Sequence, residues 1–173
     1  NDVPIMTIAY DRTAVDPQPV RWDMRRVITV STVLGLIGVG ETLLLLWFAH
    51  DVMKLDMGSI QTFIFLKLAV SGHLTLFVAR SKKAFWKKPW PSPALLWSAI
   101  LTKALATLFV VFPLGLIAPI SWSAVGLIWV YCVFWAFVED QAKLAVYRHF
   151  DRSTPRHLSF LHLLKQRTFK PGQ

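Results

Sequence analysis

Charge is scarce in this sequence, and cysteine is almost absent. Of its 173 residues, 17% are charged, against about 25% in an ordinary soluble domain. The single cysteine, Cys132, lies inside an apolar run, which excludes a disulfide framework and a cysteine-based metal site. We expect it to be a small packing residue. With 54% hydrophobic residues, the composition is that of a membrane protein.

Motifs for nucleotides, haem and metals are also missing. The sequence has no glycine-rich phosphate loop, and its polar stretches are too short for a nucleotide-binding domain. His73 has no second histidine inside an apolar run, so we expect it to be a hydrogen-bonded packing residue instead of a haem ligand. No cofactor-binding or metal site is predicted in this chain.

Four apolar runs are each long enough to cross a membrane. A hydrocarbon core about 30 Å thick requires roughly 20 residues of helix. We therefore predict an all-α polytopic membrane protein with one partial helix, four antiparallel transmembrane helices and a short amphipathic C-terminal helix. The expected segments are a truncated helix at 1–12, a loop at 13–26, spans at 27–48, 60–79, 94–112 and 122–147, and a basic tail at 148–173.

The basic residues lie in the gaps between these runs. A formal net charge of +9 would suggest a nucleic-acid partner in a soluble chain, but here its distribution indicates topology. Four Lys and Arg residues lie between Arg12 and Arg26, five between Arg80 and Lys88, and six after Tyr147, whereas the alternate loops hold only Lys54. The positive-inside rule therefore places the three basic segments, including the C-terminus, in the cytoplasm.

The tail has a helix-start signal at Thr154-Pro155. The segment that follows is too short to span a membrane, so we expect it to lie on the anionic inner leaflet. A regulatory role is the alternative.

The first twelve residues form an apolar run that holds one carboxylate, Asp2, and ends at Asp11-Arg12. The run has no initiator Met and no signal-peptide pattern, and it is too short to cross a bilayer. We interpret it as the second half of a membrane helix and expect the chain to be a fragment.

Asn1-Asp2, two further residues, Ile-Met-Thr-Ile and then Asp-Arg resemble the sixth membrane helix of proton-pumping P-type ATPases. The similarity continues through residues 71–81, the Pro-rich entry to the third span, and 126–131 with Asp140 and Lys143, and it covers residues 1 to about 150. Val3-Pro4 replaces the Gly-Thr of plant and fungal pumps, which favours a prokaryotic pump.

The resemblance implies that the chain is the C-terminal membrane region of such a pump, from the sixth helix to the tenth. It implies that Asp2 takes up and releases the proton, with Asn1 as possible support; the alternative is that Asp2 only caps a helix. It also implies a full-length parent in the cell membrane that binds ATP and Mg²⁺. The expected partners are the lipid bilayer and the parent's remaining membrane helices and cytoplasmic domains.

Ionisable residues inside the spans are candidate sites, because burying them is costly. Glu41 and Lys67 fall at about the same depth by a rise of about 1.5 Å per residue, so we predict an intramembrane charge pair, structural or transport-linked. Lys103 could snorkel, pair with Glu139 or Asp140, or lie near Asp2.

Two further groups of residues are expected to support the helices. Glu139, Asp140 and Lys143 are interpreted as a network at a helix end. Small residues on one face of the first span predict close helix contact; they are Ser31, Gly35, Gly38 and Gly40.

Two other functions remain open at this point. A free-standing four-span scaffold or assembly protein would have a start codon at or just before Asn1, whereas a pump would have an apolar segment and a phosphorylation motif upstream. A pump for another cation is the third reading. One carboxylate with few other oxygen ligands suits a proton better than a divalent metal, which needs about six or more oxygens.

Overall fold

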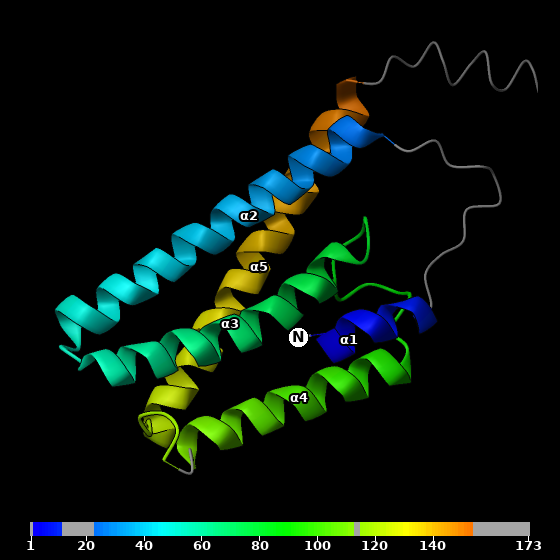
Figure 1. Cartoon of the computed structure of the whole chain (residues 1–173). Coiled ribbons are helices and arrows are strands. Elements are labelled where there is room, and N and C mark those ends of the chain that lie inside the picture. Colours follow the sequence, from blue (N-terminus) through cyan, green and yellow to red (C-terminus); the bar gives the residue numbers. More distant parts are fainter. Residues whose placement is uncertain (1, 12–22, 113–114, 154–173) are drawn as a thin grey trace, which may run out of the picture.

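The computed structural model describes residues 2–11, 23–112 and 115–153 (Figure 1). Within these ranges the chain is helical and contains no strand. A short helix, α1 (Asp2–Thr7), continues into a 3-10 turn at Ile8–Tyr10. The four long helices are α2 (Met24–Trp47), which widens into a π-helical turn at Phe48–Val52, α3 (Met57–Ala79), α4 (Pro93–Val111) and α5 (Trp122–Ser153).

All four long helices have the length and apolar composition of membrane spans. The candidate spans are Met24–Val52, Met57–Ala79, Pro93–Val111 and Trp122–Asp151. The predicted helical polytopic membrane fold is therefore confirmed. The short amphipathic helix expected after Thr154, and most of the loop at 13–26, lie outside the described residues.

Side-chain caps determine where three of the long helices begin. The carboxylate of Asp23 accepts a hydrogen bond from the Arg26 main-chain N–H, and Asp56 accepts one from Ser59. The Ser92 hydroxyl caps α4 in the same way, with Pro93 in its first turn. Because these caps precede the apolar runs, α2 and α3 begin about one turn before the predicted spans.

The helix α3 lies at the centre of the arrangement (Figure 1). It packs against α5, α2 and α4, and α5 crosses both α3 and α2. The short helix α1 lies alongside α4, on the other side of α3 from α2. Each long helix runs opposite to the one before it, as the sequence predicts for four successive spans.

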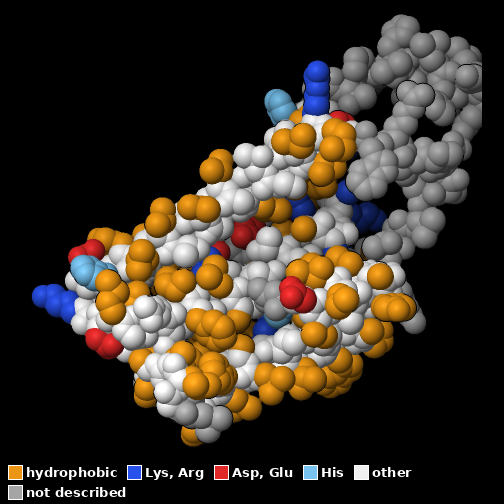
Figure 2. Space-filling view, in the orientation of Figure 1, with side chains coloured by type: hydrophobic (Ala, Val, Ile, Leu, Met, Phe, Trp, Pro, Cys, Tyr) orange, Lys and Arg blue, Asp and Glu red, His pale blue; other side chains and the backbone are white. Residues whose placement is uncertain are grey.

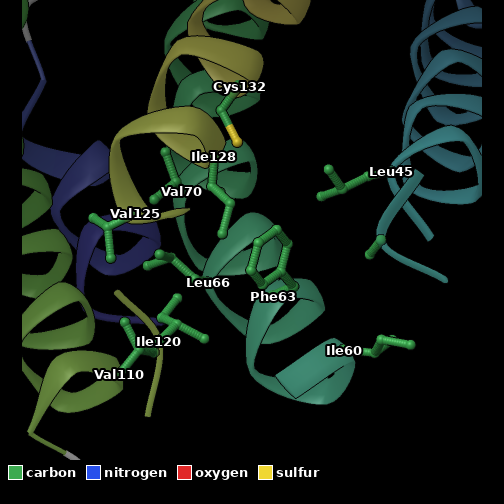
Figure 3. Packing of buried hydrophobic residues seen from close by; sticks show 11 residues of the cluster. Leu45, Ile60, Phe63, Leu66, Val70, Val110, Ile120, Val125, Ile128 and Cys132 are labelled. Atoms are coloured by element: carbon green, nitrogen blue, oxygen red, sulfur yellow. The ribbon is translucent and has the colours of Figure 1, made fainter. Parts of the chain in front are cut away.

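The buried core lies where α3 and α5 meet the end of α2 and the end of α4 (Figure 3). Phe63, Leu66 and Val70 of α3 pack against Ile128 and Cys132 of α5. In lipid, such contacts act through close packing, because lipid tails are as apolar as the side chains themselves. The single cysteine is buried here, as expected for a packing residue.

Large apolar side chains cover the outer surface of the long helices (Figure 2). Leu36 on α2, Trp97 on α4 and Val130 on α5 are each about 70% exposed: 68%, 68% and 72% respectively. Helices that are apolar on every side belong in the interior of a large protein or in a membrane. These outward-facing residues are therefore the surface that the chain presents to lipid or to other membrane helices.

Candidate functional site

The structure brings Glu41 and Lys67 together. The Lys67 ammonium nitrogen lies 2.5 Å from Glu41 Oε1, and the side chains of Lys67 and Glu41 are only 1% and 2% exposed, respectively. Lys67 also donates to Thr42 Oγ1 at 2.6 Å and to the Gly38 carbonyl at 3.4 Å. Three acceptors match the three N–H donors of an ammonium group. The lysine is thus fully bonded although it is buried at membrane depth.

Helix α5 also contacts this pair. The Tyr131 hydroxyl donates to the Glu41 carbonyl at 2.5 Å, and Cys132 Sγ lies 3.9 Å from the Lys67 carbonyl. Three helices therefore meet at one buried ion pair. Tyr131 and Thr42 were not among the predicted site residues, because a sequence does not reveal which neighbouring helix faces a given side chain.

Asp140 and Lys143 form a second buried pair, at the end of α3. The Lys143 ammonium lies 2.7 Å from Asp140 Oδ1 and donates to the carbonyls of Val78 and Lys83 at 2.8 and 2.9 Å. The Phe85 N–H donates to the same Asp140 oxygen at 3.2 Å. Because the last carbonyls of a helix have no partner within it, this lysine completes the end of α3.

Glu139 does not join that network, which differs from the prediction. Its Oε2 accepts a hydrogen bond from the Thr75 hydroxyl at 2.8 Å, and the residue is 2% exposed. Successive residues of a helix point about 100° apart, so Glu139 and Asp140 face different neighbours. Glu139 therefore links α5 to Thr75, about one turn before the end of α3, and leaves the helix end itself to Asp140 and Lys143.

Lys103 contacts an aromatic ring. The residue is 7% exposed, and its ammonium lies 5.5 Å from the centre of the Phe77 ring, within cation–π range. Among the described residues, no carboxylate lies within ion-pair distance of it, so the suggested pairing with Glu139 or Asp140 is not observed. His73, on the same helix as Phe77, is buried at 3% exposure, as a packing residue would be.

Asp2 occupies the first turn of α1 and is exposed. Further along this short helix Pro4 is buried, and the Thr7 hydroxyl contacts both the Pro4 carbonyl at 2.8 Å and Ser98 Oγ of α4 at 3.0 Å. The side of α1 that carries Pro4 and Thr7 is thus seated on α4. Asn1, the proposed support for Asp2, lies outside the described residues.

The end of α1 is anchored by a buried carboxylate that was not predicted as a site residue. Asp11 Oδ2 lies 2.8 Å from Arg80 Nε, and Asp11 Oδ1 accepts from the Ser92 N–H at 2.8 Å. Arg80 also donates to the Pro89 carbonyl at 3.0 Å. One carboxylate therefore ties α1 to the end of α3 and the start of α4. The sequence feature that could have indicated this role of Asp11 is the charged pair Asp11-Arg12 at the end of an apolar run.

The predicted small-residue face of α2 does not pack against another helix within the part of the chain that the structure describes. A Cβ atom added at Gly35, Gly38 or Gly40 would meet nothing within 4 Å. Instead, Ser31, Gly35 and Gly38 line a groove between α2 and α3. These small residues open a space where the sequence predicted close contact.

Comparisons with known proteins show which proteins are homologous to the chain. No protein-family model matches the chain. It is 38% identical over 144 residues to "Putative cation-transporting ATPase MJ1226" of Methanocaldococcus jannaschii, an alignment that covers 83% of this chain and 18% of that protein. The chain is a homologue of the P-type ATPases. The resemblance found in its opening residues is thereby confirmed.

Two further ATPases show weaker similarity to this P-type ATPase homologue. It is 27% identical over 173 residues to "Probable proton ATPase 1A" of Leishmania donovani, with 83% of this chain and 18% of that protein covered. It is 31% identical over 114 residues to the "Plasma membrane ATPase" of Kluyveromyces lactis, with 64% and 13% covered. The chain thus spans less than a fifth of the length of each of these relatives.

Proposed function

We propose that this chain is the C-terminal transmembrane part of an ATP-driven proton-efflux pump. It supplies part of the proton-binding helix and the four helices that support it. ATP and Mg²⁺ bind in other parts of the complete polypeptide, whose remaining membrane helices and cytoplasmic domains are this region's partners. The pump lies in the cell membrane. Its C-terminus is cytoplasmic, because the loops and the tail on that side of the membrane hold far more Lys and Arg residues than the loops on the opposite side.

The seating of α1 is the observation that carries this proposal. A helix of six residues has no stability of its own in isolation. Here it is held by the Thr7–Ser98 contact and by the buried Asp11–Arg80 pair. These contacts hold the later part of α1, and the buried Pro4 lies only two residues after Asp2, which supports a defined position for the Asp2 carboxylate. A carboxylate held at membrane depth beside a helix end suits reversible proton binding.

The relatives support a proton as the transported ion. The name of the Leishmania donovani relative, "Probable proton ATPase 1A", specifies this ion, whereas the name of the Kluyveromyces lactis relative specifies none. Homology to ATPases also supports a pump over a free-standing scaffold.

Substitution of Asp2 by Asn in the complete polypeptide tests the proposal. Asn keeps the size and the capping ability of Asp but cannot titrate. We expect Asp2→Asn to abolish proton uptake into inside-out vesicles while the protein still folds and is still phosphorylated by ATP. Asp51→Asn, at a carboxylate whose side chain is 53% exposed in the α2–α3 turn, should pump normally. Normal pumping by Asp2→Asn would refute the assignment.

A second candidate rests on the relative with 38% identity, whose name specifies a cation but no proton. Vesicle transport measured with a pH indicator, and again with Na⁺ or K⁺ replaced by an impermeant organic cation, separates the two functions. Proton movement that persists without the metal ions supports the proton pump. Transport that stops on their removal supports the other cation.

A further inference from the structure

The groove between α2 and α3 has a polar floor in an otherwise apolar surface. Its volume is about 640 Å³, and Glu139 of α5 lines it together with residues of α2 and α3. Figure 2 shows acidic and basic side chains gathered in the hollow between these helices, surrounded by hydrophobic ones. Charged groups inside a membrane generally face the interior of a bundle or a water-filled cavity.

Three polar residues of α3 follow one another along this groove. Lys67, Ser71 and Thr75 are four residues apart, so they share one face of the helix at intervals of about 6 Å. Lys67 binds Glu41 at one end of the row, and Thr75 binds Glu139 at the other. The Ser71 hydroxyl lies between them and makes no hydrogen bond to any residue that the structure describes.

Glu41 is incompletely bonded. Its Oε1 contacts Lys67, whereas its Oε2 is buried and has no hydrogen-bond partner among the described residues. The residue is 1% exposed and lines the groove. A buried carboxylate oxygen without a hydrogen-bond partner is energetically unfavourable in a dry environment, because nothing replaces the bonds that it would make to water. Water is the simplest group that removes this cost, because it donates to carboxylates and bonds hydroxyls equally well.

The spacing of the polar groups is within reach of bridging waters. Two hydrogen bonds of about 2.8 Å that meet at one water span roughly 4.6 Å, so one water joins groups whose side chains lean toward each other and two waters join groups about 6 Å apart. A water between Glu41 and Ser71, and another between Ser71 and Thr75, would each find two protein partners. The small residues Ser31, Gly35 and Gly38 on the opposite wall leave the room that these waters need.

We propose that this groove holds a hydrogen-bonded chain of water that links Glu41 to Glu139 through Ser71. The two carboxylates at the ends of this chain of water form a second proton-accepting site. This site is separate from Asp2, which lies on α1 beside α4. A hydrogen-bonded chain lets a proton pass between the two carboxylates without either side chain moving. This inference goes beyond the proposed function and does not depend on the role of Asp2.

Cysteine reactivity tests whether the groove is wet. In the complete polypeptide with Cys132→Ala, Gly35→Cys places a thiol in the groove, and Leu36→Cys places one at the same depth on the outer face. A charged methanethiosulfonate reagent is applied to membrane fragments open on both sides. Because it attacks the thiolate, which forms in water, we expect Gly35→Cys to react about tenfold or more faster than Leu36→Cys.

A matched pair of substitutions then tests the role of Ser71. Ser71→Thr keeps the hydroxyl, whereas Ser71→Val introduces a side chain of the same shape as Thr but without a hydroxyl. In the Gly35→Cys background, we expect Ser71→Val to slow labelling several-fold and Ser71→Thr to leave it nearly unchanged. Equal rates in the two variants would overturn the bridging role of Ser71, and with it the proposed chain of water.

Two outcomes of the labelling experiment would overturn the proposal directly. If Gly35→Cys reacts only with an uncharged, membrane-permeant maleimide, lipid fills the groove. If it reacts with neither reagent, another membrane helix of the polypeptide covers it. Lys82→Cys, at an exposed loop position, serves as the positive control for both reagents.

Discussion

Asp11 and Arg80 are 69 residues apart in the sequence and form a buried ion pair, with Arg80 Nε 2.8 Å from Asp11 Oδ2. The side chains are 0% and 3% exposed, respectively. Asp11 Oδ1 accepts a further hydrogen bond from the Ser92 N–H, so three elements depend on one carboxylate. The position of the short helix α1 is thus determined largely by a residue that follows it.

We expect Asp11→Ala to destabilise the protein by about 3–5 kcal/mol, because it leaves the Arg80 guanidinium buried without its carboxylate. Thermal unfolding in detergent measures the loss. Asp151→Ala removes a carboxylate whose side chain is 69% exposed and whose Oδ1 lies 2.9 Å from the Arg26 guanidinium. This control should change stability by less than about 1 kcal/mol. Equal effects of the two substitutions would contradict the importance of the Asp11 anchor.

The pair formed by Glu41 and Lys67 predicts strong coupling between substitutions. Each of Glu41→Ala and Lys67→Ala should cost about 3–5 kcal/mol, because each leaves the partner's charge buried and unpaired. The double variant should be less destabilised than the sum of the two by about 1–3 kcal/mol. Unfolding of all three variants by the same method gives the coupling energy. Simple additivity would show that the two side chains do not interact in the membrane.

Asp56 predicts a pH dependence outside the membrane. Hydrogen bonds from the side chain and the main chain of Ser59 hold the pKa of Asp56 below its usual value of 3.8. A lowered pKa in the folded state stabilises the protein above the unfolded value, and this contribution disappears as the pH falls through the folded pKa. Asp56→Ala should therefore have a lower Tm than the wild type at neutral pH but not at strongly acidic pH.

Asp56→Asn is the matched control for that measurement. Asn still caps the helix but does not titrate, so its Tm difference from Asp56→Ala should persist at acidic pH. A difference between wild type and Asp56→Ala that stays constant across the acidic range would show that the carboxylate charge contributes nothing.

The charge distribution predicts the orientation of the helices. Single cysteines placed at Lys54 and Ile117, in the Cys132→Ala background, should react with an impermeant reagent from outside the cell. Cysteines at Lys83 and Arg152 should react only from the cytoplasmic side. Labelling of intact cells, compared with inside-out vesicles, checks this. Reversal at any one of the four positions would rule out the four-span topology.

The sequence was sufficient for positions along a helix axis but not for rotation about it. Glu41 and Lys67 could be paired because a constant rise per residue sets the depth of each in its own span. The partner of Glu139 could not be predicted, because it depends on how α5 is rotated against α3. The Thr75–Glu139 bond and the separation of Glu139 from Lys143 both follow from that rotation.

Contacts between distant loops were equally inaccessible. Arg80 was counted only as one positive charge of a basic loop, yet its guanidinium is buried against Asp11 and Pro89. For the small-residue face of α2, in contrast, the sequence predicted a helix contact that the structure does not show. Glycine spacing predicts that a helix can approach closely, but it does not say whether a helix, lipid or water occupies the space.

The unequal lengths of the helices have a consequence for the surrounding bilayer. At a rise of about 1.5 Å per residue, the 19 residues of α4 extend about 28 Å and the 32 residues of α5 about 48 Å. Only α4 matches a hydrocarbon thickness of about 30 Å, so α5 must tilt or project into water. Figure 1 shows α5 crossing α3 obliquely and ending beside the start of α2, where Arg26 and Asp151 join the two helices. In a thicker bilayer, hydrophobic mismatch would therefore arise first at α4, the shortest of the long helices. In a thinner bilayer, α5 would have to tilt further.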